Sequence, residues 1–595
     1  MRSILITGFF IALIACSPAQ TNDVENNGKD SLNVSDTIIP AVVEPIGEYE
    51  FVRNKNRYPQ NYFRNPFDSA ILLSGTYCEL RNNHFHGGLD IRTGGYQGWS
   101  VKSVADGYVS RIKISPYGYG NALYITHPNG YTSVYGHLKE LSGAIANYVK
   151  DAQYQKRSFE IELFPKAGAL KVSKGQEVAL SGNTGGSGGP HLHFEIRNLA
   201  GLAVNPLLFG LDVKDHIPPQ IRQILVFHKD KEVLYSEGGY PMKKLKKGTS
   251  YLRGTPLKLK PGTYGFGMLS KDFFTDTRYR LGINYAWLTA NDQLLYQYQI
   301  EKMDFTKGRY INTHMEYYLK AKTGVNYVRL FKESFNPYPY YKQNKNGEVF
   351  LKQGDTVRLQ LFVEDYVGMR DSVSWTIVGD SAGQKIHWLA KHASDTTIRI
   401  RKGRTNTVKH SNWTISLPNS TFYHDFDLKL RDKSQRAGLL SPSLQMHYNY
   451  TPLHSHISVS YRLNKSQLAY GNKLCAVSFS GDRKVYEGGT INGSNLNFRT
   501  RSFGEYAIYL DTIPPRIRTE SIGKRFRFRV SDNLSGIKSY KASIDDKWIL
   551  MQYEPKLNLM WGEIPAWIKP GKHQFKIVVI DDRGNKSEVE RSITL

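Results

Sequence analysis

The chain has 595 residues, too many for one hydrophobic core, so several domains are expected. Aromatic residues make up 12% of it, including 39 tyrosines, which excludes an intrinsically disordered protein. The formal net charge of +26 is spread along the chain, and no helix-turn-helix, RNA-binding signature or zinc-finger spacing is visible. We therefore expect attraction to a polyanionic surface, such as a cell wall or acidic lipid headgroups, and no nucleic-acid partner.

The chain begins MRSILITGFFIALIACSPAQ. One arginine precedes an apolar run from Ile4 to Ala15, which has the length of a signal-peptide core and is short for a membrane span. The run ends in LIAC (13–16), which resembles a bacterial lipobox, so we expect a lipoprotein signal peptide over 1–15 and a lipid anchor on Cys16. The alternative is an ordinary secretory signal with an incidental cysteine.

Residues 16–49 are polar, acidic and rich in Asn and Asp, and are expected to form a flexible linker. The glycine-rich region 50–212 carries runs typical of strands: YVSRIKIS, NALYITH, YTSVYGHL and LHFEIRN. Between them, KELSGAIANYVKDAQYQ favours a short helix. The remaining cysteines, Cys78 and Cys475, indicate no disulfide framework or cysteine metal site, and each is expected to be a small buried side chain.

A partial internal repeat marks the rest of the chain. DHIPPQIR (215–222) recurs as DTIPPRIR (511–518), where paired prolines precede a first strand. VEDYVGMRD (363–371) resembles VIDDRGNKS (579–587). In both segments a predicted strand leads into an acidic turn, and glycine stands at the same position of that turn. The repeat predicts two related β domains rather than one large irregular β domain, which is the alternative.

The fold class that we predict is therefore mainly β. An antiparallel β domain is followed by immunoglobulin-like β-sandwiches. The predicted boundaries are 50–212 for the first domain, 213–378 for a sandwich with insertions, 379–510 for a β-rich domain and 511–595 for the last sandwich.

Two histidines lie two residues apart in GGPHLHFEIRN. On a strand, His191 and His193 point to one face while Leu192 and Phe194 point to the other. Two imidazoles on one face suit zinc, whose catalytic sites use three protein ligands and a water. Two surface histidines on a strand give the same pattern, so this motif alone is weak.

A second group lies in RNNHFHGGLD (81–90), where His86 and Asp90 are separated by a Gly-Gly pair that permits a bend. A nitrogen and an oxygen ligand brought together by such a turn supply two of three zinc ligands. The third can come from the His191/His193 strand. His137, in YTSVYGHLKE, lies between the two groups.

Together these segments resemble the lysostaphin-like (LytM-type) zinc metallo-endopeptidases, which hydrolyse peptidoglycan cross-links. The family's His-x-x-x-Asp, Tyr-x-His-Leu and His-x-His motifs stand here at 86–90, 135–138 and 191–193. SVADGYV, YGNALYITHPNGYTSVYGHL, VSKGQEVALSGNTG and GPHLHFEI also match. The resemblance covers roughly residues 70–200.

The resemblance implies one zinc ion (Zn2+) per chain, held by His86, Asp90 and His193. It implies that His137 and His191 stay unligated and catalytic. His191 would take the proton of a water and return it to the departing amine. His137 would hydrogen-bond the oxyanion or orient the water, and the two histidines can share or exchange these roles.

Six further residues have predicted positions outside the ligand set and the catalytic pair. Asn121 is expected to line the substrate groove, and His84 to lie at its rim or behind the ligands. Glu195 shares the face of His191 and His193, so it either supports a ligand or is a solvated charge. His127 is expected to be structural or exposed. His454 and His456 are predicted to share a strand face as ordinary surface residues.

Two departures from the family pattern matter. Gly188 stands where the family often has threonine, which puts a substrate contact in doubt. The segment 141–170 is longer than in compact members and is expected to cover part of the groove.

The predicted function is a lipid-anchored zinc endopeptidase that cleaves peptide cross-links of peptidoglycan. The alternative is a non-catalytic protein that binds peptidoglycan or activates another hydrolase through the same domain. The predicted location is the cell envelope, at the outer membrane facing the periplasm of a diderm bacterium. The β-sandwiches are expected to contact the wall or envelope proteins, by analogy of fold.

Overall fold

The structure is a computed structural model that describes residues 57–230, 233–244, 250–252, 256–274, 280–333, 335–383, 396–522 and 525–595. The predicted signal peptide, the lipidation residue Cys16 and the linker lie outside the described residues and stay predictions. In the described part, no helix is long and apolar enough to cross a lipid bilayer. The fold is mainly β, as predicted. Its α-helices are short: α1 (Gly143–Lys156), α2 (Ile311–His314), α3 (Tyr317–Thr323) and α4 (Lys465–Leu468).

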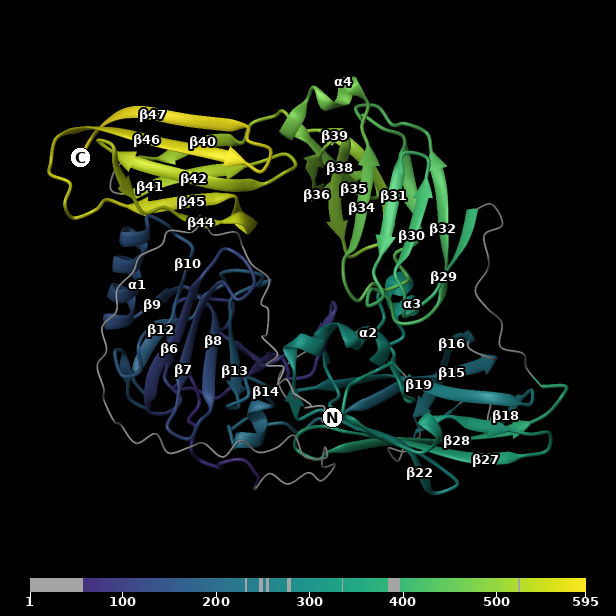
Figure 1. Ribbon diagram of the computed structural model, residues 1–595. Coiled ribbons are helices and arrows are strands. Elements are labelled where there is room, and N and C mark those ends of the chain that lie inside the picture. Colours follow the sequence, from purple (N-terminus) through teal and green to yellow (C-terminus); the bar gives the residue numbers. More distant parts are fainter. Residues whose placement is uncertain are drawn as a thin grey trace, which may run out of the picture. The chain divides into compact units, whose positions relative to one another are not determined.

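The first sheet carries the predicted site. Its strands follow the order β1 (Leu73–Gly75), β4 (Leu89–Arg92), β13 (His191–Arg197), β8 (Thr132–Leu138), β7 (Asn121–Thr126), β6 (Gly107–Ile114) and β10 (Ile161–Leu163). Neighbouring strands are antiparallel, and β6, β7, β8 and β13 lie side by side in Figure 1. Because β13 lies between β4 and β8, residues from three distant segments meet at the centre of this sheet.

Smaller elements complete this region. β11 (Lys171–Val172) pairs with β6, β2 (Leu80–Arg81) pairs with β3 (His84–Phe85), and β5 (Ser100–Lys102), β12 (Glu177–Leu180) and β9 (Glu140–Leu141) form a separate sheet. The expected short helix is present as α1, which buries Ile145 and Val149. β14 (Ala203–Val204) pairs with β13 and also with β23 (Lys302–Met303), so a later segment of the chain extends the first sheet.

The next region is a large sheet with the strand order β20-β19-β15-β16-β17-β28-β27-β21-β22-β25, to which β18, β24 and β26 also pair. Its buried side chains and those of the first region form one continuous hydrophobic cluster, from Tyr58 to Ile377. The strands are β15 (Gln220–Asp230), β16 (Val233–Lys244), β17 (Ser250–Leu252), β18 (Leu257–Leu259), β19 (Gly262–Phe273), β20 (Arg280–Leu281), β21 (Tyr285–Ala290), β22 (Gln293–Gln299), β24 (Val328–Arg329), β25 (Tyr341–Gln343), β26 (Val349–Leu351), β27 (Thr356–Glu364) and β28 (Arg370–Gly379).

The third region has two sheets around its own core. One sheet has the order β29 (Thr396–Ile400), β32 (Phe426–Lys433), β33 (Ser443–Met446), β39 (Gly504–Leu510), β35 (Leu474–Ser480) and β36 (Arg483–Gly488). The other has the order β30 (Asn406–His410), β31 (Trp413–Leu417), β34 (Ile457–Arg462), β38 (Asn495–Thr500) and β37 (Thr490–Asn492).

The last region is a β-sandwich. One sheet has the order β40 (Arg516–Ser521), β41 (Arg525–Ser531), β45 (Leu559–Glu563) and β44 (Gln552–Glu554), and the other β43 (Lys547–Ile549), β42 (Ile537–Ile544), β46 (Lys572–Asp581) and β47 (Lys586–Thr594). Alternate residues of facing strands, such as Phe526 and Phe528 of β41 and Phe575 of β46, are fully buried in one core. The predicted domain boundaries themselves stay predictions.

The two cysteines after the predicted anchor are free and buried, as predicted. Cys78 lies in the core shared by the first two regions, and Cys475 lies in β35. Each therefore contributes as a small apolar side chain.

His314 predicts a pH-dependent stability. Burial, followed by the charge of Arg329, lowers its pKa to about 3. A histidine with a depressed folded pKa stabilises the fold above its unfolded pKa and loses that contribution as the pH falls below it. Between pH 6.5 and 5 the loss is about 2 kcal/mol. In His314→Phe, hydrogen exchange in α2 and β22 should therefore show a correspondingly smaller loss of protection on acidification.

The matched control for this test is Tyr341→Phe. It removes the hydroxyl that lies 3.0 Å from Nδ1 of His314 but leaves the titrating ring in place. It should lower protection at both pH values and keep the native pH dependence. An unchanged pH dependence in His314→Phe would show that this histidine does not contribute.

Candidate metal centre

Three predicted ligands meet at the centre of the first sheet. Nε2 of His86, Oδ1 of Asp90 and Nδ1 of His193 lie 3.0 Å from one another in all three pairs. At most 6% of the surface of each of these residues is exposed. The structure thus brings Nδ1 of His193 to the donor atoms of His86 and Asp90, which lie about a hundred residues earlier in the sequence.

Strand pairing explains this convergence. Asp90 in β4 is the direct partner of His193 in β13. Because side chains alternate along a strand, His191, His193 and Glu195 share one face of β13, whereas Leu192 and Phe194 are fully buried on the other. The predicted common face of His191 and His193 is confirmed.

The Gly-Gly pair before Asp90 permits a close approach of two backbones. Neither glycine has a positive φ, so the pair is not needed for a left-handed turn. A Cβ atom on Gly88 would instead lie 2.3 Å from the carbonyl oxygen of Phe194. Gly88 therefore lets the segment that carries His86 lie against β13.

We expect Gly88→Ala to destabilise the first sheet by about 1–3 kcal/mol, because the added methyl group forces β4 and β13 apart. Thermal unfolding of the full chain, followed by loss of near-UV signal, measures this. Gly188→Ala is the matched control, since its Cβ would meet no atom within 4 Å and its φ is not positive. Equal transitions for both variants would contradict the packing argument.

His137 approaches the same centre from β8, across a β-bulge. Asn121 of β7 pairs with Leu138, whereas Leu123 pairs with Tyr135, so β8 holds one extra residue at this point. His137 itself has φ = 60°, in the left-handed region. Such backbone strain in a non-glycine residue is concentrated at functional sites.

The two histidines outside the ligand set lie beside each other. The ring centroids of His137 and His191 are 4.8 Å apart, and Nε2 of His191 lies 3.4 Å from Oδ1 of Asp90. Nδ1 of His137 donates to the carbonyl oxygen of Thr184 at 2.8 Å, and Nδ1 of His191 donates to that of Gly189 at 2.8 Å. In its neutral form, each ring therefore keeps a lone pair on Nε2.

Hydrogen bonds also set the tautomers of His86 and His193. Nδ1 of His86 donates to the carbonyl oxygen of Thr76 at 2.8 Å, which leaves a lone pair on Nε2. Nε2 of His193 donates to Oε1 of Glu195 at 2.8 Å, so the neutral form of this ring has its lone pair on Nδ1. This is the arrangement in which metal-binding histidines are held by an acceptor behind them.

Glu195 supports the centre and is not a solvated strand-end charge. It is fully buried, and besides His193 it accepts hydrogen bonds from the hydroxyl of Tyr119 and from Nε of Arg197 at 2.7 Å. Burial alone would raise the pKa of Glu195, but Arg197 and His193 lower it to about 2. The sequence left two roles open for Glu195, and the geometry selects support of a ligand over a solvated charge.

The electrostatics of the cluster favour a charged carboxylate and a neutral His137. Burial alone would raise the pKa of Asp90, but His86, His191 and His193 hold it well below its usual range. Its second oxygen accepts from Arg81 at 2.7 Å. Burial, followed by the charges of His193 and His191, lowers the pKa of His137 to about 3.

The remaining predicted residues lie outside the cluster. His84 is exposed, and its Nδ1 bonds the carbonyl oxygen of Asn82 at 2.9 Å. Asn121 is buried and donates to the carbonyl oxygen of Lys139 at 3.2 Å, so its expected substrate contact stays a prediction. His127 is buried between the backbone of Asp106 and the hydroxyl of Ser133 and is structural, one of its two expected fates.

The expectation for His454 and His456 is wrong in its geometry. Both residues precede β34, so they share no strand face. His454 packs on the ring of Tyr310, with centroids 4.3 Å apart, and His456 accepts from Nε of Arg501 at 3.1 Å. No carboxylate or further histidine joins them into a metal-ligand group among the described residues.

Several supporting residues were not predicted as part of the site. Arg81 and Tyr119 contact Asp90 and Glu195, and Thr184 holds His137 through its carbonyl oxygen. All three lie in stretches that carry the motifs. Their roles depend on side-chain contacts across strands, which spacing along the chain does not show.

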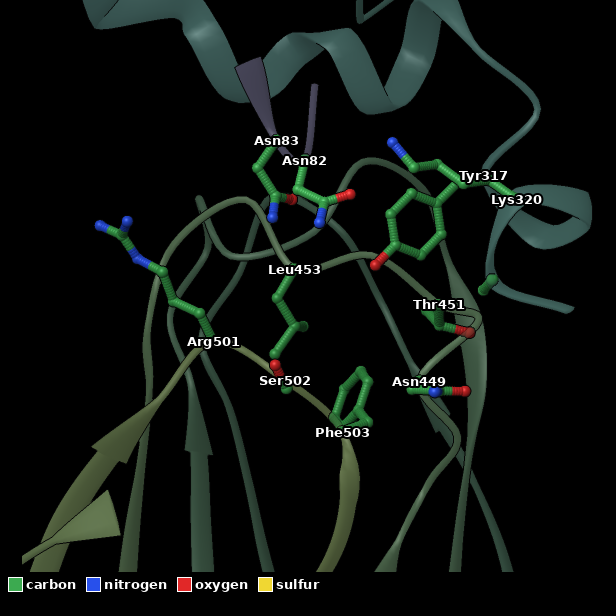
Figure 2. A pocket seen from close by; sticks show the side chains of 11 residues that line it. Asn82, Asn83, Tyr317, Lys320, Asn449, Thr451, Leu453, Arg501, Ser502 and Phe503 are labelled. Carbon is green, nitrogen blue, oxygen red and sulfur yellow. The ribbon is translucent and has the colours of Figure 1, made fainter. Parts of the chain in front are cut away.

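The described part of the chain also contains a cavity. Its volume is about 330 Å³. Figure 2 shows the side chains that line it, among them Asn82, Asn83, Tyr317, Lys320 and Arg501. The lining contains no residue of the His-Asp-His cluster. The candidate metal centre is therefore defined by its donor atoms and not by this cavity.

The donor set fits a tetrahedral divalent metal. Ligand atoms about 2.0–2.1 Å from such an ion lie about 3.3 Å from one another, close to the 3.0 Å separations of His86, Asp90 and His193. Two histidines and one carboxylate are a usual set for a catalytic site with an open fourth position. The hydrogen bonds behind His86 and His193 direct one ring nitrogen of each toward the same point as Oδ1 of Asp90.

Comparison with known proteins agrees with this geometry. The family described as peptidase family M23 matches residues 84–154 and 166–206, and a Zu5-like domain matches residues 398–511.

The curated relatives of this chain include three with named functions. Peptidoglycan DD-endopeptidase ShyA of Vibrio cholerae is 28% identical over 208 residues, 34% of this chain and 40% of that protein. DD-carboxypeptidase/endopeptidase Mpg of Neisseria meningitidis is 34% identical over 132 residues, 22% of this chain and 24% of that protein. Murein hydrolase activator NlpD of Salmonella dublin is 33% identical over 151 residues, 25% of this chain and 32% of that protein.

The chain thus spans less than half the length of each of these relatives. The matched residues include all three donors of the cluster and both neighbouring histidines. This chain therefore carries a peptidase M23 domain of the LytM type.

Proposed function

We propose that the chain is a zinc-dependent endopeptidase that hydrolyses peptide cross-links of bacterial peptidoglycan. The observation that carries the proposal is the convergence of His86, Asp90 and His193 at mutual distances of 3.0 Å. His137 and His191 add two acceptor nitrogens beside these donors. The relatives named as DD-endopeptidases support the substrate class.

Zinc bound to this donor set would supply a Lewis acid that polarises the scissile carbonyl and makes an attacking water more acidic. Nε2 of His191, held as an acceptor by the carbonyl of Gly189, would take a proton from that water and return it to the leaving amine. Nε2 of His137 is also an acceptor in its neutral form. Of its two predicted roles, orienting the water therefore suits His137 better than donating to an oxyanion.

A second candidate function is activation of another hydrolase without catalysis. The relative named as a murein hydrolase activator favours this candidate. Against it, non-catalytic members of the family usually lack a ligand or a catalytic histidine, whereas this chain keeps all five residues. We therefore place catalysis first.

The test uses purified sacculi incubated with the full chain loaded with one equivalent of zinc. We expect release of monomeric muropeptides at the expense of cross-linked dimers, and no release after treatment with a chelator. Dimers that persist in the presence of stoichiometric zinc would favour the activator function. Recovery of cleavage when a separate hydrolase is added would then identify that function directly.

We further propose that Cys16 carries a lipid anchor that holds the enzyme in the envelope, at the outer membrane facing the periplasm. The LIAC stretch and Ser17 after the cysteine support this location. Labelled palmitate should follow the native protein and not Cys16→Ala. Equal labelling of both would refute the anchor.

A further inference from the structure

Two clusters of three aspartates lie outside the metal centre. In each cluster, one oxygen of every carboxylate lies within 4.8 Å of the others. No histidine or cysteine belongs to either cluster. The clusters consist of Asp215, Asp272 and Asp365, and of Asp511, Asp532 and Asp581.

The clusters occupy equivalent positions in the second and last regions. Asp215 and Asp511 stand at the same step before the first strands, β15 and β40. The first residue of β15, Gln220, pairs with Lys271, and Asp272 follows Lys271 in the chain. Likewise the first residue of β40, Arg516, pairs with Ser531, and Asp532 follows Ser531. The match in strand register shows that equivalent corners of the second and last regions hold equivalent aspartates.

The third members also match in detail. The backbone N–H of Asp365 donates to the carbonyl oxygen of Met369, four residues later, at 3.1 Å. The backbone N–H of Asp581 donates in the same way to the carbonyl oxygen of Asn585, also at 3.1 Å. Oδ1 of each carboxylate accepts two backbone N–H groups of that turn, at 2.8–2.9 Å. These bonds hold one oxygen of each aspartate and fix its orientation in both clusters.

The last cluster contains a buried carboxylate that the fold does not satisfy. Asp511 is 1% exposed, and neither of its carboxylate oxygens makes a hydrogen bond within the described chain. The hydroxyl of Ser535 and the backbone N–H of Ile513 lie near the carboxylate and act to lower its pKa, but neither forms a hydrogen bond with its oxygens. Burial together with the charges of Asp532 and Asp581 raises the pKa of Asp511. A buried, unpaired carboxylate among other carboxylates is costly unless a cation compensates it.

We propose that each of these clusters binds one calcium ion. Hard carboxylate oxygens without nitrogen or sulfur donors select calcium or magnesium over zinc. Calcium accepts 6–8 oxygens at about 2.3–2.6 Å in irregular geometry, so oxygens up to about 5 Å apart can share one ion. Magnesium demands a near-ideal octahedron and keeps its waters, which does not suit a buried corner.

The position of the last cluster gives the ion a structural role. Asp511 directly follows β39, in the segment that connects the third region to the last sandwich. Nδ2 of Asn585 donates both to the carbonyl oxygen of Asp511 at 3.1 Å and to Oδ2 of Asp581 at 2.7 Å. A cation held here ties the connecting segment to two turns of the sandwich. The Asp215 cluster does the same at the start of the second region.

The test measures calcium on the full chain, stripped with a chelator, dialysed and reloaded with one equivalent of zinc. Equilibrium dialysis with radioactive calcium at millimolar concentration should give two ions per chain. Asp511→Asn and Asp215→Asn should each retain one, and the double variant none. Asp546→Asn, which removes an exposed carboxylate of the same sandwich, should retain two.

Thermal unfolding gives a second readout that does not depend on full occupancy. Without calcium, Asp511→Asn should be at least as stable as the native chain, because one repelling charge is gone. With calcium, the native chain should gain several degrees and Asp511→Asn should gain less. Native calcium stoichiometry in Asp511→Asn, no bound calcium in the native chain, or preferential binding of magnesium would each overturn the proposal.

Discussion

Asp90→Ala is expected to abolish both metal binding and turnover. Asp90 supplies the only carboxylate of the donor set, and its Oδ1 lies 3.0 Å from both ligand nitrogens. Without it, two histidines remain, too few to hold zinc in a catalytic site. We expect the zinc content after dialysis to fall from about one per chain to near zero. Cleavage of sacculi should fall by at least about 10³-fold, the equivalent of several kcal/mol of lost Lewis-acid stabilisation.

The control for this change is Asp151→Ala, an exposed aspartate of α1 in the same domain. It should retain zinc and turnover. Circular dichroism of both variants checks that the sheet is intact. If Asp90→Ala kept one zinc per chain, the ligand set would have to include another residue.

His191→Ala should separate metal binding from catalysis. Nε2 of His191 lies 3.4 Å from Oδ1 of Asp90, and its Nδ1–H is used by the carbonyl oxygen of Gly189. Loss of this ring removes the proposed general base but none of the three donors. Zinc content should stay near one per chain, and turnover should fall by about 10²–10⁴-fold.

His137→Ala provides the comparison, since it removes the second acceptor nitrogen from the opposite strand. It should also retain zinc and lose turnover. The loss of turnover, compared with that of His191→Ala, shows how the two histidines share proton transfer and orientation of the water. His456→Ala, outside the domain, should match the native chain in both readouts. Undiminished cleavage by His191→Ala would show that its assignment as general base is wrong.

Much of the fold was predictable because strand patterns are local. The runs that became β6, β7, β8 and β13 are short and rich in β-branched and aromatic residues, and this composition depends only on the chain itself. The helix α1 and the two related turns at Asp365 and Asp581 were visible for the same reason. Sheet order was not visible, and the pairing of β14 with β23 depends on packing between segments about a hundred residues apart.

The histidine and aspartate motifs, by resemblance to a family, determined which side chains belong to the site. The role of Glu195 was left open because a charged residue on a strand gives the same sequence pattern whether it faces water or a buried histidine. Only the structure shows it buried behind His193. His454 and His456 show the opposite case, since a repeated spacing suggested a strand that the backbone does not form.

The sequence by itself thus determined the strand-rich fold, the identity of the proposed ligands and the repeat that carries the aspartates. Only the tertiary structure decided which nitrogen of each histidine is free, that β8 bulges to turn His137 inward, and that three aspartates converge twice. The physical reason is that periodicity and motif spacing are properties of neighbours along the chain. Tautomers, bulges and ligand clusters are set by hydrogen bonds and burial between strands that meet only after folding.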